Sequence, residues 1–438
     1  MEPYLMGETP SLPTTATGHW VTTWTAMPQL TEPDNMPPPP YAKEGLVLAD
    51  TTLRQTVRVS AGGPRVRLRL SNAFGGAPLP ITRAAVALPG PRPGTAGSGG
   101  PLGARASAGA EGGARAGGGA GGGGRAGAGS SAVRAGTSRP VTFSGRPSAV
   151  VPTGAHVVSD PLDLDLVPGS VLTVTLHLAQ GQASSDLTSH PGSRTTSHLA
   201  GGDHVDALDL PDATPVDHWY LLSAVEVWAA PASATLVLLG DSLTDGRGST
   251  TNGNDRWPDR LFDRLPPGVA IANQGAGGNR VLNDGLGPSA LARLDRDVLA
   301  QSGARWLVVF EGVNDLGTAE ATRQAQERVA EELIAAYEQI IVRAAARDLL
   351  VYGATLTPFG GHDPYDDPEG HREAARQRVN AWIRGAGRFD GVIDFDRAVR
   401  DPAAPRRLAA AYDEGDHLHL NPAGYLALAE AVPVTLFR

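Results

Sequence analysis

The chain of 438 residues contains no cysteine, which excludes disulfides, thiol nucleophiles and thiolate metal sites. Its net charge of -9 and its pI near 5.7 argue against nucleic acid or another polyanion as partner, because such binders need a clustered positive surface. The length exceeds the usual size of one hydrophobic core, so we expect two domains.

The N-terminus and the hydropathy pattern bear on the location of the protein. Residues 1–20 contain no basic segment followed by an apolar one, so the sequence as written predicts a cytoplasmic protein without a secretory signal. A chain trimmed of its leader would read the same way and would be secreted. No apolar run approaches the roughly 18 residues that cross a bilayer, so no membrane anchor is predicted.

Residues 1–230 are predicted to form a domain of β-strands. Apolar and polar residues alternate on both sides of a glycine-containing turn within 53–75, which predicts a hairpin with one buried face. The stretch 171–179 repeats the same period of two. Short alternating strands separated by turn residues are typical of a β-sandwich or jelly roll, and we expect that architecture here.

An insertion interrupts this β domain at about 89–140. The segment is rich in glycine and alanine and has almost no large apolar residue, so burial cannot offset the entropy cost of ordering it. We therefore predict a flexible loop inserted between two strands.

From residue 231 to residue 438 the pattern changes to strands that alternate with helices. The predicted strands are short apolar runs at 234–240, 269–273, 306–312, 349–355 and 391–396. Amphipathic stretches lie between them, the longest at 323–348. This repetition predicts a parallel sheet with helices on both faces. Ligands bind at the carboxyl ends of such strands, so we expect one cleft among the loops after residues 240, 273, 312 and 355.

Ser242 lies in the first of these loops, in the stretch GDSLTDG that follows a buried strand and precedes a predicted helix. A serine at this place has a backbone N–H directed into the cleft and lies near a helix N-terminus, and both features can stabilise an oxyanion. The position also suits a helix N-cap or a turn serine. The GxSxG elbow of α/β-hydrolases is absent here.

Three further blocks follow at the ends of successive elements, namely NQGAGGN (273–279), GVND (312–315) and DHLHLNPAGY (416–425). Together, the four blocks resemble the GDSL or SGNH hydrolase family over about 235–438. The resemblance implies a three-layer α/β/α, flavodoxin-like parallel sheet. It also implies a nucleophile, two oxyanion-hole residues and an Asp-x-x-His pair, which fall on Ser242, on Gly278 and Asn314, and on Asp416 and His419.

The residues assigned to the oxyanion hole also have structural interpretations. Gly278 can permit a tight turn, and Asn314 can cap the helix that follows it. Glycines crowd the second block, and the family spacing of five residues from Asn273 selects Gly278. Asp241 and Asp315 are expected to support the structure rather than to belong to the triad.

The two histidines of the last block allow three interpretations. They can form a His-x-His metal site on a strand, supply the base of a catalytic triad, or lie in a polar surface turn. Asp416 precedes His419 by three residues, and Glu414 precedes His417 by the same interval. Spacing alone therefore does not choose between the two pairs.

The residues after the histidines favour a turn. Asn421 is a suitable N-cap and Pro422 a suitable first helical residue, so Asp416 and His419 are expected in a compact turn before a helix. The family pattern after its histidine also selects His419. A metal site would need more ligands, and the other histidines of the C-terminal half lie in a Pro/Gly/Asp-rich loop, so no metal or other cofactor is predicted.

These residues together predict a serine carboxylic-ester hydrolase that acts through an acyl-enzyme on short-chain, aryl or lipid esters. The N-terminal β domain resembles that of acylhydrolases associated with polysaccharides, so a carbohydrate acetylesterase is the alternative. A further alternative is a carbohydrate-binding protein with an inactive hydrolase domain. The expected partner is a small-molecule or carbohydrate ester, and the oligomeric state stays open.

Overall fold

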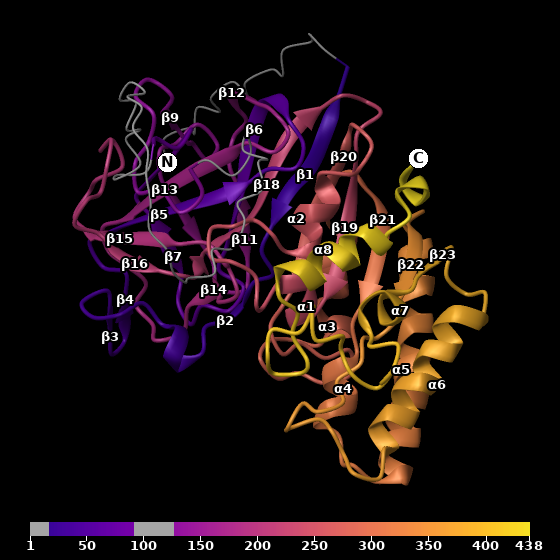
Figure 1. Cartoon of the computed structure of the whole chain (residues 1–438). Helices are drawn as coiled ribbons and strands as arrows, with labels where there is room; N and C mark the ends of the chain where they lie inside the picture. The colour runs from indigo at the N-terminus through magenta and orange to yellow at the C-terminus, as the bar shows by residue number, and fades with distance from the viewer. Residues whose placement is uncertain (1–16, 92–126) are drawn as a thin grey trace, which may run out of the picture.

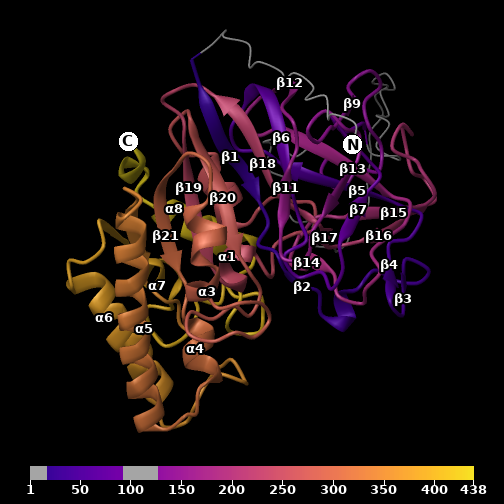
Figure 2. The same ribbon diagram turned by 180° about the vertical axis from the view of Figure 1, so that it is seen from behind.

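The structure, a computed structural model, describes residues 17–91 and 127–438. Two halves lie side by side in Figure 1, one built of strands (indigo to magenta) and one built of a sheet with helices (pink to yellow). Figure 2 shows the same arrangement from behind. Among the described helices, none combines the length and the apolar character that a membrane span requires.

The N-terminal half consists mainly of antiparallel sheets. One sheet has the order β1 (His19–Thr25), β18 (Leu222–Ala229), β6 (Gly63–Ser71) and β11 (His156–Val158), with β12 (Leu162–Leu166) also paired to β6. The other large sheet has the order β16 (Thr214–Val216), β15 (Ser197–Gly201), β5 (Thr51–Arg58), β13 (Val171–Leu178), β8 (Arg83–Ala87) and β9 (Arg139–Pro140). Apolar side chains from both sheets form one buried cluster.

Short ladders complete this half. They pair β17 (Trp219–Tyr220) with β14 (Thr188–His190) and β2 (Gln29–Leu30), β10 (Ala149–Val151) with β7 (Leu79–Ile81), and β3 (Ala42–Lys43) with β4 (Leu46–Val47). The prediction that this part of the chain is rich in β-strands is confirmed, including the strand expected at 171–179.

The hairpin predicted within 53–75 is wrong. Its two arms are β5 and β6, but β5 pairs with β13 and β15, whereas β6 pairs with β18 in the other large sheet. The connecting turn packs tightly against the sheet that contains β6, because a Cβ on Gly62 or Gly63 would lie 2.3 Å from the backbone oxygen of Leu166 in β12 or of Trp228 in β18. Alternation of apolar residues identified the strands, but it carried no information about their partners.

The flexible insertion predicted at 89–140 is corrected where the structure describes it, since residues 92–126 lie outside the described residues. Residues 127–140 are ordered, with a β-bridge between Pro89 and Val133 and with β9 paired to β8. The segment is held through its backbone rather than through apolar side chains. Gly129 N–H, for example, donates to Thr56 Oγ1 at 2.8 Å.

Arg54 on β5 holds the ordered segment 127–140 by a hydrogen bond to its backbone. Its fully buried guanidinium donates to the carbonyls of Ser131 at 2.6 Å and Ala207 at 2.8 Å, and its Nε donates to Thr175 Oγ1 at 3.0 Å. Burial lowers the pKa of Arg54 to about 10, and the negative charge of Asp209 opposes that shift. A composition-based prediction missed this contact because the ordering group lies more than seventy residues away in the chain.

We expect Arg54→Met to lower the free energy of unfolding by roughly 3 kcal/mol, because each buried carbonyl left without a donor costs about 1–3 kcal/mol. Urea unfolding monitored by circular dichroism measures the change. Arg134→Met removes an exposed arginine of the same segment and should stay within about 0.5 kcal/mol of the wild type. Equal losses in the two variants would contradict the anchoring role.

The C-terminal half is built on a parallel sheet, as predicted. Within the described residues its strands lie in the order β20, β19, β21, β22, β23, which is the 2-1-3-4-5 order of doubly wound flavodoxin-like sheets. All five predicted strands are confirmed with small shifts at their ends, as β19 (Ala234–Gly240), β20 (Val269–Gly275), β21 (Ala304–Phe310), β22 (Leu350–Ala354) and β23 (Gly391–Ile393).

The helices of this half form two packed groups. One group is α2 (Trp257–Phe262), α7 (Phe395–Val399) and α8 (Pro422–Ala431), and the other is α3 (Ala290–Leu294), α4 (Val313–Thr318), α5 (Arg323–Ala345) and α6 (His371–Gly385). The short α1 (Ser242–Asp245) contacts β19 and β20. The helix predicted at 323–348 is confirmed as α5, and α8 starts as predicted, with Asn421 as its N-cap.

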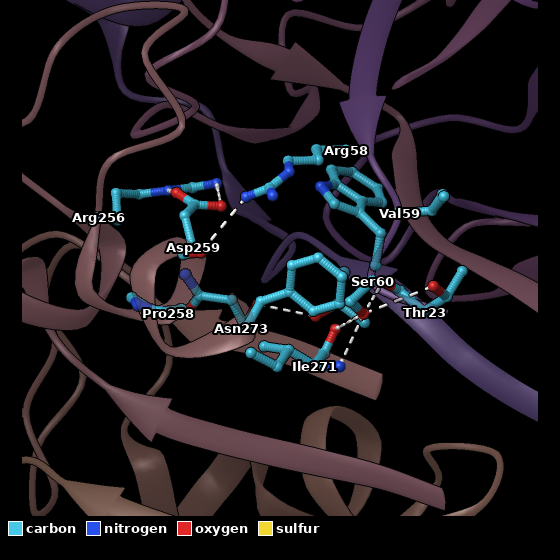
Figure 3. A pocket seen from close by; sticks show the side chains of 12 residues that line it. Thr23, Arg58, Val59, Ser60, Arg256, Pro258, Asp259, Ile271 and Asn273 are labelled. Carbon is cyan, nitrogen blue, oxygen red and sulfur yellow. Dashed lines mark hydrogen bonds and ion pairs between the residues drawn. The ribbon is translucent and has the colours of Figure 1, made fainter. Parts of the chain in front are cut away.

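The two halves meet along a seam lined by β1 and β5 of the N-terminal half and by α2 and β20 of the C-terminal half, which Figure 3 shows from close by. Ser60 Oγ donates to the carbonyl of Thr23 at 2.6 Å and accepts from Ile271 N–H at 2.7 Å. Arg58 forms an ion pair with Asp263 at 2.9 Å. The cavity at these residues has a volume of only about 30 Å³, so this part of the seam is closely packed.

Candidate active site

One cleft of about 610 Å³ lies at the carboxyl edge of the parallel sheet. The loops after β19, β20, β21 and β22 all contribute to its wall, as predicted from the strand pattern. The cleft brings together all the residues that sequence reasoning assigned to the site, namely Ser242, Gly278, Asn314, Asp416 and His419.

Ser242 is the first residue of α1 and directly follows the turn at the end of β19. The turn is tight, because a Cβ on Gly240 would lie 2.2 Å from Thr244 Oγ1. Asp241 caps the helix by accepting the N–H of Leu243 at 2.9 Å. Within the described residues the backbone N–H of Ser242 has no acceptor, so it is free to donate to a ligand in the cleft.

A chain of hydrogen bonds joins three of the predicted residues. Ser242 Oγ lies 2.8 Å from Nε2 of His419, and Nδ1 of His419 lies 2.6 Å from Oδ2 of Asp416. Asp416 also accepts the backbone N–H groups of His419 at 2.8 Å and Leu418 at 3.0 Å. Partial burial alone would raise the pKa of Asp416, but the bonds from His419 and these N–H groups lower it well below its usual range. The carboxylate therefore stays charged beside the imidazole.

His417 faces away from this chain of bonds. Its Nδ1 lies 2.6 Å from Oδ2 of Asp413, and its side chain is 51% exposed, against 6% for His419. The segment forms a turn in which His417 has a φ of +65°, and the strand required for a His-x-His metal site is not formed at these residues. The structure thus separates the two histidines as the Asn-Pro helix signal predicted.

The grouping Glu414, Asp416 and His419 places one ligand atom from each residue within 4.8 Å of the others, which a metal ion could bridge. Both ring nitrogens of His419 are already engaged, one with Asp416 and one with Ser242. A metal at this place would have to displace one of these bonds. The donor set therefore fits a proton-transferring histidine better than a metal ligand.

Asn314 is oriented for donation into the cleft. Its Nδ2 donates to the carbonyl of Asn279 at 2.8 Å, and its Oδ1 accepts from the hydroxyl of Tyr365 at 2.8 Å. These partners fix which end of the amide is the donor. The second N–H of the amide and the N–H of Gly278, which has a φ of +66° and no acceptor among the described residues, remain available.

Sequence reasoning missed Tyr365. It lies in the Pro/Gly/Asp-rich loop after β22, where no motif or periodicity distinguishes one residue from its neighbours. Burial raises the pKa of Tyr365, and the nearby charge of Asp241 raises it further, so the hydroxyl keeps its proton and donates to Asn314.

Buried carboxyl groups lie beneath the cleft, as expected for residues with a structural role. Asp315 accepts the N–H groups of Val281 and Leu282 at 2.8 and 2.9 Å and so fixes the loop after β20. Burial raises the pKa of Asp315 to about 6 and that of Asp241 to about 7, and the charge of Asp315 adds to the shift of Asp241.

The chain matches one family model, that of the GDSL-like Lipase/Acylhydrolase family, over residues 238–427. This segment contains Ser242, His419 and Asp416, which are joined by hydrogen bonds. It also contains Gly278 and Asn314, whose N–H groups are available in the cleft. Residues 238–427 form a GDSL-like lipase/acylhydrolase domain. The family resemblance seen in the four sequence blocks is therefore confirmed, and it applies to the C-terminal half of the chain.

Solved structures resemble about half of the chain. One from Desulfitobacterium hafniense DCB-2, described as a lipolytic protein of the G-D-S-L family, is 18% identical and covers 45% of this chain and 97% of its own, with a TM-score of 0.36. A carbohydrate acetylesterase from Sinorhizobium meliloti is 15% identical and covers 47% and 100%, with a TM-score of 0.37. The comparison with curated proteins gave no match.

The acylhydrolase domain does not enclose the cleft alone. One wall is made by residues that lie before the family match, namely Gln29, Glu32, Asn35, Pro191, Gly192 and Arg194. Nε2 of His190 lies 2.8 Å from Oδ1 of Asp245, three residues after Ser242, and both side chains are buried. A Cβ on Gly192 would lie 1.8 Å from the Asp245 carboxylate. The N-terminal half therefore packs directly against α1, which no sequence motif had indicated.

The raised pKa of Asp241 predicts a pH effect on stability. The folded protein holds a proton on this group up to about pH 7, whereas an unfolded aspartate releases it near pH 4, so the unfolding free energy falls as pH rises between these values. We expect Asp241→Asn, which keeps an acceptor for Leu243 N–H and cannot ionise, to lose less stability than the wild type between pH 5 and pH 8, by a few degrees in Tm. Thermal unfolding at the two pH values measures this.

Asp34→Asn is the matched control for that experiment, because Asp34 is exposed on the N-terminal half. Its Tm should follow the pH dependence of the wild type. A parallel pH dependence in the wild type and Asp241→Asn would show that the Asp241 carboxyl is ionised in the folded protein.

Proposed function

We propose that the chain is a serine carboxylic-ester hydrolase that acts through an acyl-enzyme on short-chain, aryl or lipid esters. The observation that supports this proposal most directly is the bonded series from Ser242 Oγ through His419 to Asp416, with separations of 2.8 and 2.6 Å. A nucleophile within hydrogen-bond reach of a base that is itself oriented by a carboxylate is the arrangement that acyl transfer requires.

In the proposed acylation step, Ser242 Oγ attacks the carbonyl carbon of the ester. His419 Nε2 accepts the hydroxyl proton as the bond forms, and the charged Asp416 stabilises the imidazolium and fixes the tautomer. The tetrahedral intermediate then collapses, His419 returns the proton to the leaving alkoxide, and the alcohol departs. The acyl group remains on Ser242.

The developing oxyanion would be bound by three N–H donors that converge on the cleft. We assign them to the backbone N–H groups of Ser242 and Gly278 and to the side-chain amide of Asn314, whose orientation Tyr365 and Asn279 support. Donors of this kind act when negative charge develops on the carbonyl oxygen and therefore lower the barrier of the chemical step.

Deacylation repeats these steps with water in place of the serine hydroxyl. His419 removes a proton from the water, the hydroxide attacks the acyl carbon, and the proton passes to Ser242 Oγ as the carboxylic acid leaves. Each step uses only side chains and backbone groups of this chain, so the proposal involves no cofactor.

Ser242→Ala should lower ester turnover by about 10⁴ to 10⁶, and His419→Ala should do the same, because removal of either member interrupts the nucleophile and its base. The measurement is the release of p-nitrophenol from p-nitrophenyl acetate and p-nitrophenyl hexanoate, with circular dichroism to confirm folding. His417→Ala is the matched control, since this exposed histidine is paired with Asp413 and not with Ser242.

The proposed assignment fails if the folded Ser242→Ala variant keeps a tenth of the activity. It also fails if His417→Ala is inactive while His419→Ala retains turnover. A wild-type protein that hydrolyses acetylated sugars far faster than aryl or lipid esters would replace the proposed substrate class with the carbohydrate acetylesterase alternative.

Asn314→Ala should lower kcat by about 10² to 10³, because one preorganised oxyanion donor is lost. Thr318→Ala is the control on the same helix, since the Thr318 hydroxyl donates to the carbonyl of Asn314 without lining the cleft. Steady-state kinetics on one aryl ester distinguishes them. A rise in KM at constant kcat in Asn314→Ala would show that this amide binds the substrate and the transition state equally.

A further inference from the structure

Two arginines, Arg194 and Arg247, line the cleft that contains Ser242 and His419. Other arginines of this protein bind carboxylates, as Arg376 binds Asp396 at 2.7 Å. Across residues 17–91 and 127–438, the side chains of Arg194 and Arg247 have no hydrogen-bond or ion-pair partner. The cleft therefore presents two cations whose binding capacity the fold itself does not use.

Arg194 occupies a strained and closely supported position. Its φ of +50° is one that residues other than glycine rarely adopt, and Asn252 N–H donates to its carbonyl at 2.8 Å. Its Nε is buried without a partner among the described residues. Backbone strain and an unpaired buried donor both cost free energy, and both tend to persist where a ligand uses them.

The segment that carries Arg194 is fixed relative to the nucleophile. His190 at the end of β14 binds Asp245 of α1, and Gly192 lies against the same carboxylate. Arg194 follows two residues later, so its backbone is positioned by the helix that begins at Ser242. The backbone that carries this guanidinium therefore needs no rearrangement to present it to the cleft.

Arg247 belongs to the other half, is exposed, and also lines the cleft. Its N–H donates to the carbonyl of Ser242 at 3.0 Å, and the hydroxyl of Tyr425 donates to its carbonyl. Burial raises the pKa of Tyr425, and the positive charge of Arg194 opposes that shift. Both arginines therefore line the cleft that contains Ser242.

The carboxylates that line this cleft already have partners. Their bonds are Asp245 to His190, Asp416 to His419, and Glu32 to Gln29 and Asn35. An incoming anion would therefore replace no intramolecular ion pair when it reached either arginine.

We propose that the ester substrate carries an anionic group, such as a carboxylate, that binds Arg194 and Arg247 while the ester carbonyl lies at Ser242. The inference rests on the proposed esterase function and deepens it by specifying the charge of the substrate. Guanidinium groups bind carboxylates and related oxyanions through paired N–H donors. The net charge of -9 would otherwise repel such a substrate, so a local cationic pair supplies the attraction.

The test compares esters that differ in one charge. On the alcohol side, para-acetoxybenzoate is compared with para-acetoxybenzamide, and on the acyl side, mono-p-nitrophenyl adipate is compared with p-nitrophenyl hexanoate. We expect kcat/KM to favour the anionic member of at least one pair by about tenfold or more at low ionic strength. The pair that shows the preference identifies the half of the ester that carries the anion. Added salt should reduce the preference.

Arg194→Gln and Arg247→Gln should each reduce the anionic-to-neutral ratio of kcat/KM by about tenfold, because each removes one charged donor pair. Arg280→Gln is the charge-matched control. Its guanidinium is exposed, is already bonded to Thr318 and to the carbonyl of Asp284, and does not line the cleft. The ratio should stay at the wild-type value in this control.

An assay without turnover separates this inference from the proposed function. In the Ser242→Ala protein, para-hydroxybenzoate and para-hydroxybenzamide are titrated by calorimetry for an anion on the alcohol side, and adipate and hexanamide for one on the acyl side. We expect the anion of the relevant pair to bind about tenfold more tightly, and Arg194→Gln in the same background should remove that difference.

The possible outcomes decide the two proposals independently. Equal turnover and equal binding of all charged and neutral pairs would overturn the anion site while leaving the esterase proposal in place. An equal fall of the ratio in Arg194→Gln and Arg280→Gln would also overturn it, because general electrostatics would then explain the preference. Tight anion binding that depends on Arg194, in a wild-type protein without ester turnover, would instead support the site and reject the esterase proposal.

Discussion

The hydrogen bond between Ser242 and His419 joins residues 177 positions apart and determines how the candidate active site is organised. It can form because β19 ends at the same edge of the parallel sheet as the turn that leads into α8. The carboxyl ends of parallel strands all lie at one edge of the sheet. Loops that are distant in the sequence therefore lie close together at that edge. The bonds of Asn314 to Asn279 and Tyr365 depend on this same meeting of loops, whereas Asp416 binds His419 within one turn.

The second constraint is the packing of the N-terminal half against α1. The buried pair of His190 and Asp245 and the close approach of Gly192 join the β half to the helix that starts with Ser242. Because this contact lies within one helical turn of the nucleophile, the β half forms part of the cleft wall rather than a separate appendage. The family match covers residues 238–427 and therefore does not include the residues of the N-terminal half that line the cleft.

Buried charges in this protein are held by specific partners, and the exceptions are informative. Arg54 donates to the carbonyl of Ser131 in the glycine-rich segment 127–140, and Arg376 is paired with Asp396 deep in the C-terminal half. Each such group is satisfied where water is excluded, which is the usual requirement for a buried cation. Arg194 and Arg247 differ from these two because they line the cleft, where Arg194 is half-buried and Arg247 is exposed, and neither side chain has a hydrogen-bond or ion-pair partner among residues 17–91 and 127–438.

The sequence by itself determined the strand and helix order of residues 231–438, the cleft edge, and the choice of His419 over His417, because apolar periodicity and the Asn-Pro cap are local signals. Only the tertiary structure decided the partners of β5 and β6, the ordering of 127–140 by Arg54, and the place of Tyr365 and Arg194 in the cleft. These features arise from contacts between residues far apart in the chain. The alternation of apolar residues and the composition of a segment indicate which of its side chains can be buried. They do not indicate which distant residues the segment contacts.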